Sequence, residues 1–226
     1  MIKLEFRKAG DFAAAEKALF GKSKWWGFPD MPEDLDWPET PVQEEYEDED
    51  GKLQLDEYDD PLTFLCQIRC EDIAEFDPEG RLPHEGMLYF FAALDYFLGD
   101  LDAALSPGMG AWDPGFFRVL YAPSCEDLHT HSLLYDDGSP AALPAEEIIF
   151  SREESDAAGD GFRLLGRPFY DETAEENPGR LSLLQVDEND DWDLRFFDSG
   201  MLNFLISPKN LAARKFSAVR CWLHSA

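Results

Sequence analysis

The densest group of potential metal ligands in the sequence lies between Cys125 and His131. This segment carries a thiol, two carboxylates and two imidazoles. In an extended strand His129 and His131 would face the same side, as a chelating pair requires. Zinc sites use three or four such ligands at recognisable spacing, and no second cluster in the sequence supplies the remainder. The pattern favours a polar loop edge, with metal binding by the two histidines as the alternative.

A second oxygen-rich stretch resembles part of a calcium-binding loop. Asp187, Asn189 and Asp191 place side-chain oxygens at alternate positions, and Asp198 falls where a twelfth-position ligand would be. Trp192, however, stands where such loops need a glycine for their sharp turn, and we expect strands, not helices, on both sides. An acidic β-turn is therefore favoured, with calcium binding as the alternative.

No nucleophile stands in a motif that would activate it. The chain lacks Gly-x-Ser-x-Gly, and turn chemistry explains Ser199 between Asp and Gly. Cys66 and Cys70 lie in or beside an apolar run, while His84 and His224 are isolated. A phosphate-binding loop and a complete dinucleotide fingerprint are also missing from the sequence. We therefore assign no catalytic, cofactor-binding or metal-binding residue and no cofactor, and a non-enzymatic protein is favoured.

The composition describes a folded and strongly acidic chain. Its 226 residues include 48 Asp and Glu against 19 Lys and Arg, which gives a formal net charge of −29. Hydrophobic residues make up 44% and aromatic residues 14%, far more than a disordered acidic chain contains. Because such a surface repels phosphate groups, we expect neither nucleic acid nor an anionic membrane as a partner. A basic protein partner remains open.

The cysteines and the N-terminus indicate a soluble cytoplasmic protein. The four cysteines are widely spaced, without a Cys-x-x-Cys pair or a compact secreted framework, so we expect reduced and mostly buried thiols. The first residues lack an apolar stretch followed by a small-residue cleavage site. The sequence has no run of about 18 apolar residues, the length that predicts a membrane-spanning helix.

The hydrophobic pattern predicts many strands and a few short helices. Helices are expected over 12–20 after the N-cap Asp11, over 71–76, and over 209–213 after Ser207 and Pro208. We predict that 151–180 is mostly loop. Strands are expected over 61–70, 87–94, 115–123, 147–150, 181–187, 192–197, 200–206 and 216–223.

The acidic charge is concentrated in residues 30–60, which carry 15 acids and one lysine. Self-repulsion opposes compaction at this density, so we expect a mobile tip at 44–51, and the order of 40–60 stays open. Trp37, Tyr46 and Tyr58 interleave with the acids and are of the type that anchors protein interfaces. We expect this segment to be the place where a basic protein docks.

Two parts of the chain repeat one pattern. An apolar-Gln-apolar strand containing Gln67 or Gln185 precedes a Gly-Met-Leu strand that begins at Gly86 or Gly200, at distances of 19 and 15 residues. We interpret this as a duplication within one domain, with approximate halves 1–125 and 126–226. Chance similarity between β-rich segments is the alternative.

These segments also carry a resemblance to a known family. The Trp-Gly-Phe-Pro of 26–29, the Leu-Gly-Arg-Pro of 165–168 and the Gly-Met-Leu strands resemble the motifs of the bacterial YwqG-like family over nearly the whole chain. That family has Gly-Gly-x-Pro where this chain has 26–29, and Gly-Asp-x-Gly where 197–200 reads Phe-Asp-Ser-Gly. The resemblance implies an α+β fold with an internal repeat and an unknown biochemical function.

Together these observations predict a β-rich α+β protein with two similar strand-containing halves and a few short helices. The favoured function is binding of a basic protein partner by an acidic surface, as an immunity or antitoxin-type protein does. The alternative is an enzyme or small-ligand-binding protein that uses a cleft between the two halves.

Overall fold

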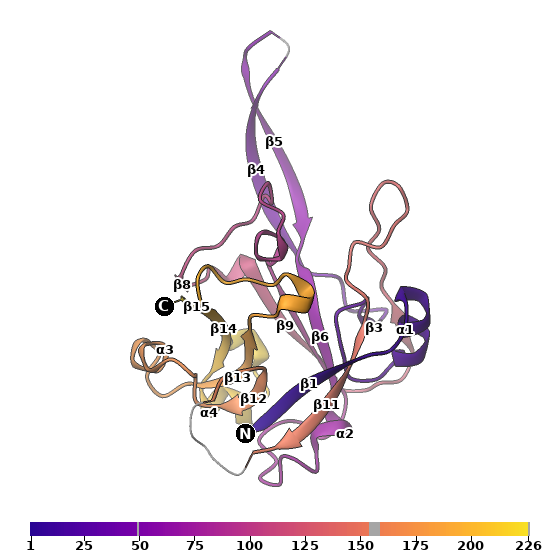
Figure 1. Ribbon diagram of the computed structural model, residues 1–226, viewed down its shortest axis with the longest axis vertical. Helices are drawn as coiled ribbons and strands as arrows, with labels where there is room; N and C mark the ends of the chain where they lie inside the picture. Colours follow the sequence, from indigo (N-terminus) through magenta and orange to yellow (C-terminus); the bar gives the residue numbers. More distant parts are fainter. Residues whose placement is uncertain (49, 154–158, 226) are drawn as a thin grey trace.

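The fold is organised around one large antiparallel sheet. In this computed structural model, which describes residues 1–48, 50–153 and 159–225, eleven strands form a curled half-barrel in the order β8-β15-β14-β13-β12-β1-β11-β2-β6-β7-β9 (Figure 1). The predicted β-rich character with a few short helices is confirmed. The sheet strands are β1 Ile2–Lys8, β2 Lys24–Trp25, β6 Thr63–Arg69, β7 Met87–Ala92, β8 Gly110–Ala111, β9 Phe117–Ala122, β11 Glu146–Arg152, β12 Arg163–Gly166, β13 Leu181–Asp187, β14 Gly200–Ile206 and β15 Arg220–Ser225.

Two smaller sheets and short helices complete the described part of the chain. Strand β3 (Asp30–Pro32) pairs with β10 (Leu128–Thr130), and β4 (Glu39–Glu47) pairs with β5 (Leu53–Pro61). The helices are α1 Phe12–Leu19, α2 Cys70–Ile73, α3 Asp171–Glu176 and α4 Pro208–Ala212, with 3₁₀ turns η1 Asp95–Leu98, η2 Pro114–Phe116, η3 Asp190–Trp192 and η4 Phe216–Ala218. None of the helices in these described ranges has the length and hydropathy needed to cross a bilayer.

The first strand lies at the centre of the large sheet. β1 pairs along its whole length with β11 on one side, and its first two residues, Ile2 and Lys3, pair with β12 on the other. β11 in turn pairs with β2. From these central strands the sheet continues through β6, β7 and β9 on one flank and through β13, β14 and β15 on the other. The N-terminal strand therefore joins the two flanks of the sheet.

Aromatic side chains pack together where the central strands meet. Trp25 is fully buried and stacks on Trp192, with ring centroids 5.8 Å apart and an interplanar angle of 16°. Phe6 and Phe162 contact both indoles edge-on or at a tilt. Because aromatic pairs of this kind bury large apolar areas, they hold the curled sheet together.

Several predicted elements are confirmed. The strand expected over 181–187 is β13 and that over 200–206 is β14, both almost wholly buried. The side chain of Asp11 accepts a hydrogen bond from the backbone N–H of Ala14, and Ser207 likewise accepts from Asn210, so both predicted N-caps are present. The buried Cys66, Cys70 and Cys221 and the partly buried Cys125 are all free thiols.

Other expectations are wrong or incomplete. The predicted strand over 192–197 is a 3₁₀ turn followed by irregular chain, because Asp193 takes a left-handed conformation with φ of 53°. The stretch 151–180, expected to be mostly loop, contains β12 and α3 in its described part. The predicted strand over 216–223 begins with η4, and β15 starts only at Arg220.

The acidic segment forms a long hairpin. β4 and β5 pair from Glu39↔Pro61 to Glu47↔Leu53, and the ribbon stands away from the body of the molecule (Figure 1). At its turn, the carboxylate of Asp48 accepts backbone hydrogen bonds from Asp50 and Lys52. The predicted mobile tip at 44–51 overlaps the end of β4, which is a regular strand up to Glu47. Residue 49 lies outside the described ranges, and the mobility of the tip stays a prediction.

Candidate binding pocket

A large cavity lies at the base of this hairpin. Its volume is about 900 Å³, and three chain segments surround it: 60–64 at the end of β5, 95–100 around η1, and 133–143. Trp26, Gly27 and Trp37 complete its lining. The volume falls within the range of small-molecule and side-chain binding sites.

Tight backbone contacts fix the apolar part of the pocket. Leu62 donates its backbone N–H to the carbonyl of Pro38, and the indole N–H of Trp37 donates to the carbonyl of Leu62 at 2.8 Å. The Trp37 ring also packs against Phe64 and Phe91, with centroid distances of 6.5 and 5.6 Å. The hairpin base therefore holds one aromatic wall of the pocket in place.

Three aspartates from separate segments line the side of the pocket next to the hairpin. Asp60 is the next-to-last residue of β5, Asp95 begins η1, and Asp100 follows Gly99, whose φ of 101° ends that turn. Asp95 is oriented by the hydroxyl of Thr63, which donates a hydrogen bond of 2.7 Å to its carboxylate.

The surroundings raise the pKa of two of these carboxyl groups. Desolvation raises the pKa of Asp60, and the negative charges of Asp95 and Asp100 raise it further. Asp95 is partly exposed to solvent. Desolvation and the negative charge of Asp100 nevertheless raise its pKa, while the hydrogen bond from Thr63 lowers it. The three carboxylates thus repel one another across a partly apolar site.

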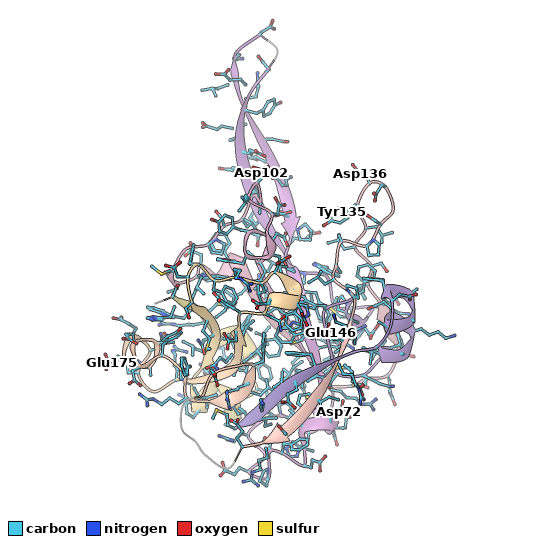
Figure 2. All side chains as sticks on the ribbon, viewed as in Figure 1. Asp72, Asp102, Tyr135, Asp136, Glu146 and Glu175 are labelled. Atoms are coloured by element: carbon cyan, nitrogen blue, oxygen red, sulfur yellow. The ribbon has the colours of Figure 1, made fainter. Side chains whose placement is uncertain are left out.

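The opposite wall is a loop that rises beside the hairpin. Leu134 and Pro140 form an isolated bridge, and Tyr135 donates its backbone N–H to Ser139. Figure 2 shows Tyr135 and Asp136 near the end of this loop, across from Asp102, which lies beside the hairpin in this view. Tyr135 is 63% exposed, and Asp136 and Asp137 add two further carboxylates to the lining.

The pocket combines uncompensated negative charge with aromatic walls. Its lining contains five aspartates and neither lysine nor arginine. In the described ranges, none of those aspartates takes part in an ion pair. Such a site attracts cations and repels phosphates and carboxylates, because no positive group offsets its field.

The candidate zinc ligands lie elsewhere on the surface. His129 is on β10, and His131 follows that strand. Both line a shallow depression of about 320 Å³ with Glu33 and Thr130. Over 1–48, 50–153 and 159–225, no group of three or more His, Cys, Asp or Glu side chains could hold a metal ion.

Two residues of the candidate calcium loop bind backbone groups with their side-chain oxygens. Asp187 accepts from the N–H groups of Gly161 and Glu188, and Asn189 accepts from Asp191. These contacts cap the turn between β13 and η3. The side-chain oxygens of Asp187 and Asn189 thus have structural partners.

The possible nucleophiles and bases are scattered through the fold. Burial raises the pKa of Cys66 well above its ordinary value and that of Cys70 to about 12, so both thiols are unreactive core groups. His84 lies 3.6 Å from the buried Asp77, and His224 stacks on Tyr170 with ring centroids 4.3 Å apart. The structure does not bring these cysteines and histidines together in one site.

A family model described as a domain of unknown function, DUF1963, matches residues 23–224. The chain belongs to the DUF1963 family. The DUF1963 match begins after β1 and α1 and includes every segment that lines the pocket. No curated protein matches the sequence.

Sequence reasoning missed most of this DUF1963 pocket. Only Asp60 and Trp37 lay in a segment singled out as a binding surface. Asp95, Asp100 and Asp136 had no motif around them, and only the repeated placement of aspartates in loops next to apolar strands hinted at them. Their meeting depends on which strands are neighbours in the sheet.

Proposed function

We propose that this DUF1963 protein is a non-enzymatic binding protein whose acidic face docks a basic protein partner. The observation that carries the proposal is the pocket with five aspartates and no lysine or arginine in its lining, at the base of an acidic hairpin. We also propose the finer assignment to YwqG-like proteins, which rests on the motifs at 26–29, 165–168 and 197–200. A cytoplasmic location fits the four free thiols.

The hairpin has the features of a surface that awaits a partner. Two-stranded ribbons are only marginally stable in water, and Glu44 lies directly across from Asp56, where like charges repel. Tyr46, Leu53 and Leu55 expose 51%, 63% and 53% of their area along the same ribbon. A basic polypeptide on this ribbon would cover the apolar side chains and neutralise the acids.

This arrangement fits an immunity or antitoxin-type role. A protein that captures a basic toxin must cover a cationic surface and associate quickly. An acidic ribbon beside an acidic pocket gives long-range attraction, which raises the association rate at low ionic strength. The proposal therefore predicts salt-sensitive capture of a basic protein.

The test is a pulldown from the native cell at low and near-physiological ionic strength, with the hairpin as the variable. In one variant, four hairpin acids are neutralised: Glu44→Gln, Glu45→Gln, Asp56→Asn and Glu57→Gln. In the control variant, four acids on and near α3 are neutralised: Asp171→Asn, Glu172→Gln, Glu175→Gln and Glu176→Gln. We expect a basic protein that the wild type and the control retain and the hairpin variant loses.

Two results would contradict the proposal. If no basic protein is retained at either ionic strength, the protein has no partner of the proposed kind. Equal loss from both variants would show that total charge, and not the hairpin, governs the association.

A small-ligand or enzymatic role is the second candidate, and a specific observation favours it. The pocket is lined by residues of both approximate halves, such as Asp95 and Asp136, and carboxyl groups with raised pKa values are found at catalytic sites. This candidate predicts that a neutral metabolite from a cell extract binds the pocket and is lost on Asp95→Asn. A pocket that takes only cations would count against it.

We further infer that the two flanks of the sheet are copies of one unit. Gln67 and Gln185 occupy corresponding strands and accept a backbone N–H from Asp30 and Phe169 at 2.8 and 3.1 Å. In both cases the residue that donates directly follows the proline of a Gly-x-Pro turn. The residue before that glycine is Trp26 or Leu165, with φ of 60° and 56°.

The strand pairings support the same inference. β2-β6-β7-β9 on one flank corresponds to β12-β13-β14-β15 on the other, and β6 and β13 each have a register irregularity two residues before their Gln. The first strand would be β1 in the unit that contains β2, β6, β7 and β9, and β11 in the unit that contains β12 to β15. Each of these pairs with the second strand of the other unit, as in an exchange between two copies.

Paired substitutions test the duplication. Gln67→Leu and Gln185→Leu each leave buried backbone groups without partners, so each should lower the unfolding free energy by about 2–3 kcal/mol in chemical denaturation. Gln43→Leu, on the exposed hairpin, is the control and should cost less than about 0.5 kcal/mol. A large loss from only one of the two buried substitutions would argue against equivalent roles.

A further inference from the structure

We infer that the pocket at the base of the hairpin receives the cationic end of a lysine or arginine side chain that belongs to the basic partner. This inference rests on the proposed function and names the group that the pocket recognises. It is carried by the geometry of three elements: the aspartates around the cavity, the aromatic wall, and the adjoining hairpin.

The first element is negative charge without a counterion. Asp60, Asp95 and Asp100 come from β5, η1 and the turn that follows, and all three line the same cavity. Their mutual repulsion is one reason why the pKa values of Asp60 and Asp95 are raised. A single ammonium or guanidinium group placed among them would convert this repulsion into attraction to each carboxylate.

The internal lysine of the protein shows how this chain treats a carboxylate that has only a structural role. Lys24 is fully buried, and its ammonium lies 2.9 Å from Asp30 and 3.5 Å from Glu16. Asp30 also accepts hydrogen bonds from Gly21, Gln67 and Thr130. This buried carboxylate is thus paired with an ammonium, whereas the described pocket aspartates have no cationic partner.

The second element is the aromatic wall. Trp26, Trp37 and Phe64 line the same cavity, and the indole of Trp37 is held by its hydrogen bond to the carbonyl of Leu62. Lysine and arginine pack their aliphatic stems along apolar surfaces and place their charges over aromatic rings. A metal ion has no aliphatic stem that could pack against these rings.

Trp26 adds an unpaired polar group to this wall. Its side chain is 2% exposed and lines the pocket, and its indole N–H lacks an acceptor among the described residues. A buried donor without an acceptor is costly. A peptide in the pocket would relieve this cost where it places a carbonyl oxygen beside Trp26.

The third element is the position of the pocket next to the hairpin. Asp60 is both the last acid of the ribbon and a pocket residue, so an extended segment lying along β5 can deliver a side chain directly into the cavity. The exposed Tyr58 stands two residues earlier on the same face of this strand. A basic polypeptide therefore contacts the ribbon and the pocket continuously.

Short peptides test the inference without the partner. The probe is acetyl-Gly-Arg-Gly-amide, and its control is the same peptide with citrulline, which has nearly the same shape but no charge. Binding is followed by the indole N–H resonances of the tryptophans in a nuclear magnetic resonance titration. We expect a dissociation constant near 1 mM for the arginine peptide and at least tenfold weaker binding of the citrulline peptide.

Matched variants locate the site. Asp60→Asn and Asp95→Asn should each weaken arginine-peptide binding by about fivefold to tenfold, and both proteins should fold because each loses a repulsive charge. Glu175→Gln removes one charge from α3, far from the pocket, and should change the affinity less than twofold (Figure 2). Equal binding of both peptides, or equal weakening by all three variants, would overturn the inference.

The peptide titration and the pulldown can give different results, and these distinguish a failure of this inference from a failure of the proposed function. If the hairpin-dependent partner is captured but the arginine peptide does not bind the pocket, the docking proposal stands and this inference is wrong. If the peptide binds in the pocket but no basic protein is captured, the pocket assignment stands and the docking role is wrong.

Discussion

At the scale of the residue, the informative contrast is between paired and unpaired carboxylates. Burial raises the pKa of Glu16, while the ammonium of Lys24 and the backbone N–H of Phe28 act in the opposite direction. Desolvation also raises the pKa of Asp60 and of Asp95, but their neighbours are carboxylates instead of an ammonium. Their ionisation therefore opposes folding until a cation arrives.

The Asp95→Asn substitution tests this cost. A raised pKa in the folded state means that stability is fully present below the unfolded pKa, near 3.8, and is lost as pH rises through the higher folded value. At pH 7 the variant should melt about 1–2 °C above the wild type, since solvent screening keeps the effect below 1 kcal/mol. At a pH below 3.8 the two melting temperatures should converge. A variant that is less stable at pH 7 would show that the Thr63 hydrogen bond outweighs the repulsion.

At the scale of the element, the β4–β5 hairpin is attached to the body by a short base. Thr40 donates its hydroxyl to the carbonyl of Gly115. Among the described residues of the ribbon beyond Thr40, only Val42 has a buried apolar side chain. From Gln43 onward the described side chains are mostly exposed. The outer hairpin therefore contributes little to the core and is available for binding.

A truncated hairpin tests this separation. Replacing residues 43–57 with Asn-Gly joins Val42 to Tyr58, which are already cross-strand partners, through a favoured two-residue turn. We expect the far-ultraviolet circular dichroism of a folded β-protein and a melting temperature within about 4 °C of the wild type. Loss of cooperative unfolding would show that the ribbon is part of the folding unit.

At the scale of the whole molecule, net charge and fold are largely separate. The core of the curled sheet is aromatic and aliphatic, whereas 15 of the 48 acids lie in residues 30–60, which include the exposed hairpin. Residues 43–57 alone carry eight acids and one lysine. Charge of this magnitude destabilises the compact state by self-repulsion, which salt screens.

Salt should therefore stabilise the protein, and the hairpin should account for part of the effect. Between about 0.01 M and 0.5 M sodium chloride the Debye length falls from about 30 Å to below 8 Å. We expect the melting temperature of the wild type to rise by several degrees and that of the truncated variant to rise by less, as measured by differential scanning calorimetry. Equal increases would place the repulsion elsewhere.

Local sequence determined the elements whose signals are complete within a few residues. The apolar runs of β13 and β14, the N-cap at Ser207 and the proline after it were all readable, because capping and continuous burial follow from adjacent side chains. The alternation of Trp192, Leu194 and Phe196 was equally regular, and all three are buried. The chain that carries them is a turn and not a strand, because Asp193 takes a left-handed conformation. Periodicity alone does not distinguish such a turn from a strand.

By itself, the sequence determined that this protein is folded, β-rich and acidic, and that its acids gather in residues 30–60. Only the tertiary structure decided that this segment is a ribbon and that a pocket lies beneath it. The physical reason is the order of the strands: Asp60, Asp95 and Asp136 are about 35 to 75 residues apart in the chain, and long-range pairing in the sheet brings them to one cavity.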